Sequence, residues 1–374
     1  MTVNIRQIDS KSDRKKFVKM PWLVYKNDPH WIPPLLLERL ETISKKKNPF
    51  FEHGEAALFL AERDGVAIGR ITAHTNRLHN EYHKDKAGFF GFFESINEQA
   101  VADALLRTAE GWLKAKGCDN VLGPESFSTN EEVGLLIKGF DLPIMLFCPY
   151  NPPFYQELIE KSGYQKAKDL YGWHYTVGDI PEAPRQLAEA VEKHPGLKMR
   201  VLDRKNFKRD VMILRDIFNT SWNKNWGYVP WTDREAAYSA SMLKLIVKED
   251  LIVVAELNGE PIGISICVPN LMEIFDGLNG RLLPFGIFKL LYRLKFHKYE
   301  QARLLLLGIR PEHRRNLGGL SVLLYVNTHK GGIKLGIKTA ELSWTLEDNE
   351  RINTGITFMG GTVGKVYRVF GKNL

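Results

Sequence analysis

The sequence predicts an α/β (α+β) chain that consists of two similar lobes in tandem. The segments Leu60–Gly69 and Val254–Gly263 share five residues at positions 194 apart. A second pair of segments, Asn151–Gly163 and Asn349–Gly361, begins with Asn and ends with Gly at a spacing of 198. Matches at nearly constant spacing indicate an internal duplication. A chain of 374 residues also exceeds what a typical single core needs.

Both copies of the first repeat are predicted to be β-hairpins. In each copy an alternating apolar strand leads to a turn, which is Asp64-Gly65 in one copy and Asn258-Gly259 in the other. These dipeptides favour the left-handed conformations of a two-residue hairpin turn. In both copies of the second repeat, the pattern is that of a short helix followed by an apolar-aromatic strand.

One segment of the second half predicts a ligand. An apolar strand over Leu304–Ile309 is followed by Pro311, by a basic turn with two glycines, and then by leucines at helical spacing. The N–H groups at the start of such a helix are open to an anion, at the positive end of the helix dipole. A βα turn that binds nothing is the alternative. The predicted pyrophosphate site consists of Arg314, Arg315, Asn316, Leu317, Gly318, Gly319 and Leu320.

This turn resembles motif A of the GNAT acyltransferase superfamily, Arg/Gln-x-x-Gly-x-Gly/Ala, which holds the pyrophosphate of acyl-coenzyme A. Arg314 takes the first position and Gly319 the last, whereas Leu317 replaces the first glycine. The segment from Asn349 to Gly361 resembles motif B of the same superfamily. The resemblance implies two tandem GNAT-like lobes, each a mixed, mostly antiparallel twisted sheet flanked by helices.

We expect an N-terminal lobe at residues 1–180 and a C-terminal lobe at residues 181–374. In the N-terminal lobe, the helix that follows Gly88–Asn97 is preceded by neither a glycine turn nor an arginine pair, and Glu94 and Glu98 would repel a pyrophosphate. Acyl-coenzyme A is therefore expected in the C-terminal lobe alone.

The resemblance also implies how the pantetheine arm is held. In GNAT folds the strand before motif A splays away from the next strand, here Thr339–Leu346, and the arm enters the gap. We expect the backbone of Leu307, Gly308 and Ile309 to pair with it, and Asn349 to contact it. A helix N-cap is the alternative role for Asn349.

The proton-transfer groups are less directly indicated. Many GNAT enzymes carry a motif B tyrosine that protonates the departing thiolate, but Thr357 stands at that position here. Tyr367, in the last strand, is the expected substitute. Glu347, or its neighbour Asp348, is the expected general base, and capping of the following helix is the alternative role of both acids.

The segment Asn219–Pro230 corresponds to the region that shapes the acceptor site in GNAT enzymes. Core packing of at least two of its aromatic side chains is the alternative. The residues expected to bind the acceptor are Trp222, Asn225, Trp226 and Tyr228.

A basic, apolar insertion precedes motif A. Within residues 281–298, Ile287, Leu290, Leu291 and Leu294 follow helical spacing and Lys/Arg residues flank them. This pattern is typical of a helix that lies on an anionic membrane. A helix packed on the other lobe gives the same pattern.

Charge and composition exclude several classes of protein. The net charge of +8 is concentrated in residues 281–315, which suits a phosphate ligand or an anionic surface, and no DNA-binding motif accompanies it. No apolar run is long enough to span a membrane, and the first residues lack the apolar core of a signal peptide. The three cysteines are far apart, so neither a disulfide nor a cysteine-ligated zinc is expected. His79 and His83 have the spacing of zinc ligands on a helix, but a polar loop is the expected structure there, so no metal site is expected. We expect a cytoplasmic protein, peripheral on the inner face of the membrane if the insertion binds lipid.

Further segments resemble a group of bacterial double-GNAT proteins, some of which are linked to N-acylation of long-chain bases. The resemblance implies an acyltransferase that moves an acyl group from acetyl-coenzyme A, or a longer acyl-coenzyme A, to an amine acceptor, which is lipid-like if the insertion binds a membrane. An acceptor that is a peptide, an aminoacyl-tRNA or a small amine stays open, as does an inactive GNAT scaffold. The segments are Phe17–Trp22, Asp28–Pro34, Asn48–His53, Gly88–Glu94 and Glu341–Asn349.

Overall fold

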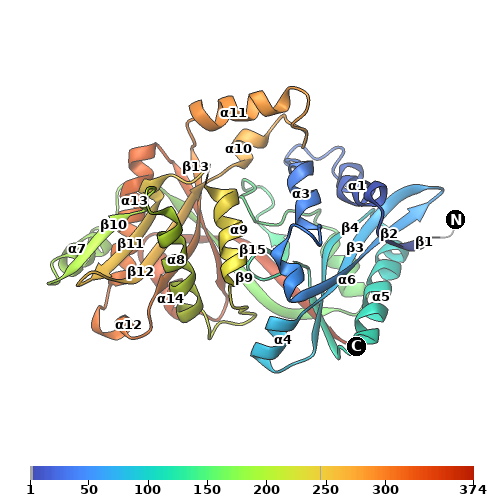
Figure 1. The fold of residues 1–374 in the computed structure, drawn as a ribbon, viewed down its shortest axis with the longest axis horizontal. Coiled ribbons are helices and arrows are strands. Elements are labelled where there is room, and N and C mark those ends of the chain that lie inside the picture. The colour runs from blue at the N-terminus through green and yellow to red at the C-terminus, as the bar shows by residue number, and fades with distance from the viewer. Residues whose placement is uncertain (1–2, 245) are drawn as a thin grey trace. The chain divides into compact units, whose positions relative to one another are not determined.

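The computed structural model describes residues 3–244 and 246–374, and Figure 1 shows the course of the chain. The chain divides into two compact units. Unit 1 contains Met1–Leu170, Phe275–Phe288 and Val366–Leu374, and unit 2 contains Tyr171–Ile274 and Lys289–Lys365. Each unit therefore includes segments that are far apart in the sequence.

Unit 1 is built on a mixed sheet with the strand order β1-β2-β3-β4-β5-β15. Only β4 and β5 pair in parallel among these neighbours. One apolar face of α5 packs on the sheet, with Val101, Leu105 and Ala109 in the same core as Phe59 and Ile71. The elements are β1 (Asn4–Ile8), α1 (Lys11–Lys19), α2 (Pro21–Val24), α3 (Leu36–Thr42), β2 (Gly54–Arg63), β3 (Val66–Asn76), α4 (Arg77–His83), β4 (Ala87–Ser95), α5 (Gln99–Ala115), β5 (Asn120–Gly123), β6 (Glu125–Ser126), β7 (Glu132–Val133), β8 (Leu135–Lys138), α6 (Tyr155–Lys161) and the end of β15 (Thr362–Asn373).

Unit 2 repeats this plan with the strand order β9-β14-β13-β12-β11-β10, in which β13 and β14 pair in parallel. Helix α8 covers one face, where Ile217 packs with Val254 and Ile264. Helix α13 covers the other face, where the Thr328 and Ser265 hydroxyls lie 2.7 Å apart. The elements are β9 (Gln165–Thr176), α7 (Glu182–Glu192), β10 (Leu197–Val201), α8 (Phe207–Ser221), α9 (Asp233–Leu243), β11 (Ile252–Leu257), β12 (Glu260–Pro269), α10 (Met272–Phe275), α11 (Gly286–Phe296), β13 (Gln301–Ile309), α12 (His313–Asn316), α13 (Leu320–Leu335), β14 (Thr339–Leu346) and α14 (Glu350–Phe358).

The predicted duplicated hairpins are confirmed as β2–β3 and β11–β12. Both turns have left-handed backbone, with φ of 52° at Asp64 and at Asn258. Both hairpins also shift register at the same place, after Ala61 in one and after Ala255 in the other. The duplication therefore extends to the irregularities of the strands, which spacing alone does not predict.

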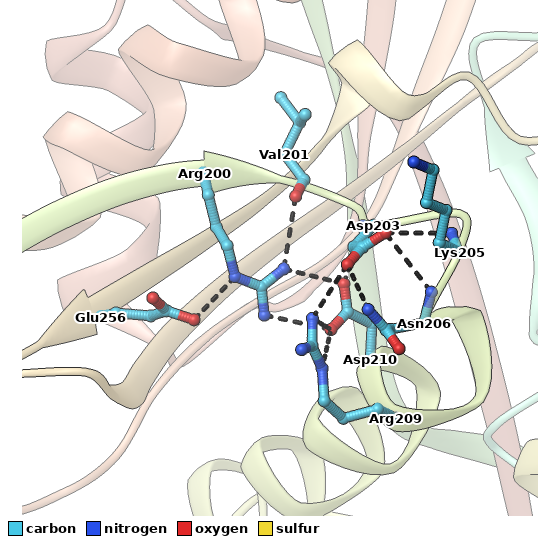
Figure 2. Close-up of polar contacts among 8 residues, drawn as sticks. All are labelled: Arg200, Val201, Asp203, Lys205, Asn206, Arg209, Asp210 and Glu256. Carbon is cyan, nitrogen blue, oxygen red and sulfur yellow. Dashed lines mark hydrogen bonds and ion pairs between the residues drawn. The ribbon is translucent and has the colours of Figure 1, made fainter.

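An arginine between two carboxylates joins β10 to the hairpin of unit 2 (Figure 2). Arg200 donates through Nε to Glu256 at 2.6 Å and through its terminal nitrogens to Asp210 at 2.7 and 3.0 Å. The backbone N–H of Asp203 also donates to Asp210. Burial raises the pKa of Asp210, but these donors outweigh it and hold the pKa below its usual value.

Unit 1 contains the same arrangement. Arg6 on β1 donates to Glu62 at 3.2 Å and to Asp13 at 2.9 Å. Arg6 and Arg200 are 194 positions apart, and so are Glu62 and Glu256, which is the spacing of the hairpins. Sequence analysis did not find this repeat, because the partners come from three separate elements.

We expect Asp210→Ala to destabilise the protein by about 3 kcal/mol, because it leaves Arg200 partly buried without its main partner. Asp13→Ala, the equivalent change in unit 1, should cost less, since the Asp13 side chain keeps 19% of its surface exposed while that of Asp210 keeps none. Urea unfolding measures both. Because the pKa of Asp210 is depressed on folding, the wild-type contribution is present above the unfolded pKa and is lost as the pH falls through the folded one. Equal losses for the two variants would contradict the assignment.

Candidate active site

The parallel strands β13 and β14 part half-way along their length. Their pairing joins Gln301–Leu304 to Thr339–Leu342 and ends there, although β13 continues to Ile309 and β14 to Leu346. Past this point, the backbone groups of β13 that point toward β14 are not used by that strand. This is the splay that the GNAT resemblance implies, and Leu307, Gly308 and Ile309 lie in its open part.

A buried charge network fixes the paired half of these strands. Arg303 and Glu341 are register partners, and Lys365 donates to Glu341 at 2.7 Å. Arg303 donates through Nε to the Ser343 hydroxyl at 2.9 Å. Burial raises the pKa of Glu341, but the charges of Lys365 and Arg303 outweigh it and keep the carboxyl ionised. The network ties β13, β14 and β15 together just below the splay.

A β-bulge on β13 lies where the splay begins. Ile266 on β12 pairs with Leu306 and Cys267 pairs with Leu304, so Leu305 is the extra residue. A bulge re-aims the backbone groups beside it. The irregularity lies at the position where a thioester carbonyl is expected.

The motif A turn follows β13 directly. Arg314, in α12, donates through Nε to the Ile309 carbonyl at 2.9 Å and through a terminal nitrogen to the Ser221 carbonyl at 2.6 Å. Burial lowers the pKa of Arg314, with a contribution from nearby Arg351. Arg314 thus holds the turn against the end of α8, while Arg315 is exposed.

The residues at the start of α13 divide into two kinds. Leu317, at the expected glycine position, is buried with 6% of its surface exposed, so its side chain is part of the core. Gly319 has a φ of 92°, and a Cβ there would lie 3.0 Å from Leu187 and Val191. Gly318 has open space where a Cβ would stand, and no side chain caps α13. The exposed backbone at Gly318 and the uncapped helix start fit an approaching phosphate.

Helix α14 begins beside this turn. Asn349 is its N-cap and accepts from the Ile352 N–H at 3.4 Å, which is the alternative role stated for it above. Asn353 donates to the Leu346 and Glu347 carbonyls. Arg351 donates to the Arg314 carbonyl at 3.1 Å and so adds a third cation to the turn. Sequence analysis missed Arg351, because it belongs to a different motif in the sequence.

Three of the predicted acceptor residues lie just after α8, and Trp222 is its C-cap. Tyr228 is buried, and its hydroxyl donates to the Asn219 side chain at 3.1 Å, so it packs in the core. The Trp222 ring lies edge-on to Trp344, with centroids 6.2 Å apart. Trp344 is on the splayed part of β14, so this pair brings the α8 end to the gap. Asn225 donates its N–H to the Trp222 carbonyl, and Trp226 is half-buried.

Two curated proteins match the sequence over almost their full length. Protein YghO of Escherichia coli (strain K12) is 37% identical over 374 residues, which cover 99% of this chain and 95% of YghO. The bacterial ceramide synthase of Caulobacter vibrioides is 36% identical over 377 residues, which cover 100% of this chain and 98% of that protein. The chain belongs to the family of these two proteins. No family model matches it.

Solved structures show the GNAT fold. A tandem GNAT protein from the clavulanic acid biosynthesis pathway matches 100% of this chain and 98% of its own, with a TM-score of 0.60 and 10% identity. A GCN5-related N-acetyltransferase from Sphaerobacter thermophilus matches 99% and 95%, with a TM-score of 0.52 and 14% identity. The predicted tandem GNAT architecture is confirmed.

The equivalent region of unit 1 has a buried carboxyl group where unit 2 has the motif A turn. Strands β4 and β5 also pair in parallel, over only Ala87–Phe89 and Asn120–Leu122. Glu94 is buried there and accepts from Tyr155 at 2.7 Å and from Arg70 at 3.3 Å. Burial raises the pKa of Glu94. A carboxyl group, rather than a glycine turn, thus lies at the end of β4, so this GNAT lobe stays the one predicted not to bind acyl-coenzyme A.

The two predicted proton-transfer residues lie in different units. Glu347 follows β14 in unit 2, half-buried and one residue past the end of the splayed strand. Tyr367 is in unit 1, where it is 1% exposed and pairs with Leu136 of β8. The structure therefore brings Glu347, and not Tyr367, into the unit that holds the motif A turn.

Residues 3–244 and 246–374 contain neither a cluster of metal ligands nor a membrane-spanning helix. No group of three or more His, Cys, Asp or Glu side chains in this part of the chain is arranged to hold a metal ion. None of the helices described is both long and apolar enough to cross a bilayer.

Proposed function

We propose that this chain transfers an acyl group from a coenzyme A thioester to an amine, and that the amine is a lipid-like long-chain base. The observation that carries the proposal is the conjunction, within unit 2, of a splayed β13–β14 pair with the uncapped, cationic start of α13. A relative of 36% identity named bacterial ceramide synthase supports a lipid-like acceptor.

Different residues of unit 2 bind different parts of the thioester in such a transfer. The backbone at Gly318, Gly319 and Leu320, together with Arg315, binds the pyrophosphate, and Leu307–Ile309 pair with the pantetheine arm. Asn349 holds the start of α14 beside that arm. A β13 N–H at the bulge stabilises the oxyanion that forms when the amine attacks the thioester carbonyl.

Proton transfer completes the reaction. Glu347, directly or through one water, takes the proton that the amine loses as the C–N bond forms. The C–S bond then breaks, and the coenzyme A thiolate leaves and takes up a proton from water, while a role for Tyr367, which is buried in unit 1, stays a prediction. The aromatic pair Trp222–Trp344 and the residues Asn225 and Trp226 border the acceptor site.

Thiol release tests this proposal. The purified chain is incubated with octanoyl-coenzyme A and a long-chain base, and separately with a small amine, a peptide and an aminoacyl-tRNA. We expect thiol release with the long-chain base and an amide product by mass spectrometry. Release with another acceptor alone would overturn the lipid version, and binding without any release would favour the inactive scaffold.

The basic insertion exposes an unusual amount of apolar surface. The sequence predicts that the face of α11 with Leu290 and Leu291 is the one that lies on a membrane. This prediction is only partly correct, because Leu290 packs inward with 8% exposure. A neighbouring face of α11 and the segment before it is exposed instead. Its members, which we call the α11 apolar face, are Leu283 (75% exposed), Phe285 (77%), Phe288 (67%), Leu291 (53%), Tyr292 (66%) and Phe296 (57%).

We expect the α11 apolar face to bind anionic membranes, since exposed Lys289, Lys295 and Lys298 lie next to it. Flotation with vesicles of phosphatidylcholine and phosphatidylglycerol should carry the chain upward, and less so at high salt. Phe285→Ser with Phe288→Ser should reduce binding about 100-fold, because each exposed ring contributes on the order of 1–2 kcal/mol when buried. Ile333→Ser, at an exposed site on α13, is the control. Equal flotation of both variants would rule this face out.

A further inference from the structure

Unit 2 contains a narrow apolar cavity, partly open to solvent, at the base of the splay. The empty space around it, open solvent included, is about 460 Å³. Leu304 and Leu342, the last paired residues of β13 and β14, both line it, and so do Ala302 and Ala340, which lie two residues earlier on the same strands. The cavity therefore begins where the two strands part.

The lining of this cavity is almost entirely hydrocarbon. Of its four hydroxyl and imidazole side chains, three are paired with protein groups, and burial raises the pKa of the fourth, Tyr325, so that it stays neutral. The Tyr175 hydroxyl lies 2.7 Å from His329 Nδ1, and His329 Nε2 lies 2.7 Å from the Gly178 carbonyl. Thr328 is paired with Ser265. Because cavities of this kind do not hold ordered water well, an apolar ligand fits it best.

The lining groups are also uncharged near neutral pH. Burial raises the pKa of Tyr175 to about 12 and that of the Cys267 thiol to about 12. Burial lowers the pKa of His329, although its bond to Gly178 opposes the shift. The side chains that line the cavity are therefore neutral, which favours binding of a hydrocarbon chain.

The direction in which the thioester would lie along β13 indicates which ligand enters the cavity. The motif A turn lies beyond Ile309, at the far end of β13, and the pantetheine arm is proposed to follow β13 back toward Leu305. A chain attached to the thioester then continues along the same line, past Leu304 and Ala302 and into the cavity. The acceptor amine has to approach the thioester from outside this line.

We propose that the cavity binds the acyl chain of the thioester and so makes medium or long acyl chains the preferred substrate. This inference rests on the proposed function of the site. The chain of the acceptor is the competing occupant, and the experiment separates the two.

Calorimetry with acetyl-, butyryl-, hexanoyl- and octanoyl-coenzyme A, without acceptor, measures the contribution of each methylene. We expect the affinity to rise about fourfold per buried methylene, corresponding to ~0.8 kcal/mol. Ala302→Leu and Ala340→Leu, made separately, fill the cavity. Each should leave acetyl-coenzyme A affinity unchanged and flatten the increase for longer chains. Ile333→Phe adds bulk on the exposed side of α13 and should keep the increase.

The outcomes are distinct. No binding of any thioester by the wild type would end the proposed function itself. Binding that is independent of chain length, or an increase that survives both filled variants with thermal unfolding unchanged, would overturn the cavity assignment and leave the function in place. If filling the cavity changes the dependence of turnover on the acceptor's chain length and not on the acyl chain, the cavity holds the acceptor and the proposal is wrong.

Discussion

Gly318→Val should reduce the affinity for acyl-coenzyme A about 100-fold while leaving the stability of the protein almost unchanged. A Cβ at Gly318 meets no atom within 4 Å, and the residue does not have left-handed backbone, so the fold accepts a side chain there. The added methyl groups occupy the space through which a phosphate would reach the uncapped start of α13. Loss of charge-assisted bonds to backbone N–H groups is worth about 2.7 kcal/mol, which corresponds to that factor.

The neighbouring glycine is the matched control. Gly319→Ala has to place a side chain at a φ of 92° and 3.0 Å from Leu187, so it should lower the free energy of unfolding by about 1–2 kcal/mol. Calorimetry and urea unfolding on both variants separate ligand contact from fold. Undiminished binding by folded Gly318→Val would show that the turn is only structural.

Arg314→Glu should abolish acyl-coenzyme A binding, with a loss on the order of 1,000-fold. Arg314 donates to the carbonyls of Ile309 and Ser221, and each such bond from a charged group contributes about 1.5–3 kcal/mol. A glutamate would place its carboxylate against those carbonyls and reverse the charge of the turn. Both effects displace the turn and oppose a pyrophosphate.

Two further variants separate the two causes. Arg314→Lys keeps the charge but cannot reach both carbonyls from one planar group, so it should retain part of the affinity. Arg315→Gln removes an exposed charge without a structural bond and should weaken binding about tenfold. The opposite order, with Arg315 the more sensitive, would mean that direct charge rather than turn geometry governs binding.

Local patterns in the sequence predicted much of the fold. The Asp-Gly and Asn-Gly turns specify hairpins by backbone chemistry, so β2–β3 and β11–β12 appear where the repeat placed them. The strand, glycine turn and helix around Gly319 were found for the same reason. The resemblance to GNAT proteins then supplied the parallel pairing of β13 with β14, which no local pattern encodes.

Contacts between distant segments could not be predicted. The pairs Arg200–Asp210 and Trp222–Trp344 join elements whose sequences contain no sign of each other. In the sequence, Leu317 is only a departure from the glycine of motif A, whereas in the structure it is a core residue. Helical spacing on α11 showed that an apolar face exists, but it could not tell which of two adjacent faces packs inward.

The most direct test of the account is the stoichiometry of coenzyme A binding, measured by calorimetry on the full chain and on Gly318→Val. We expect one site per wild-type chain and an affinity about 100-fold lower in the variant, since within the described residues an open cationic turn beside splayed strands occurs in unit 2. Two sites per chain, or one site whose affinity is unchanged in Gly318→Val, would place the ligand elsewhere and contradict this assignment.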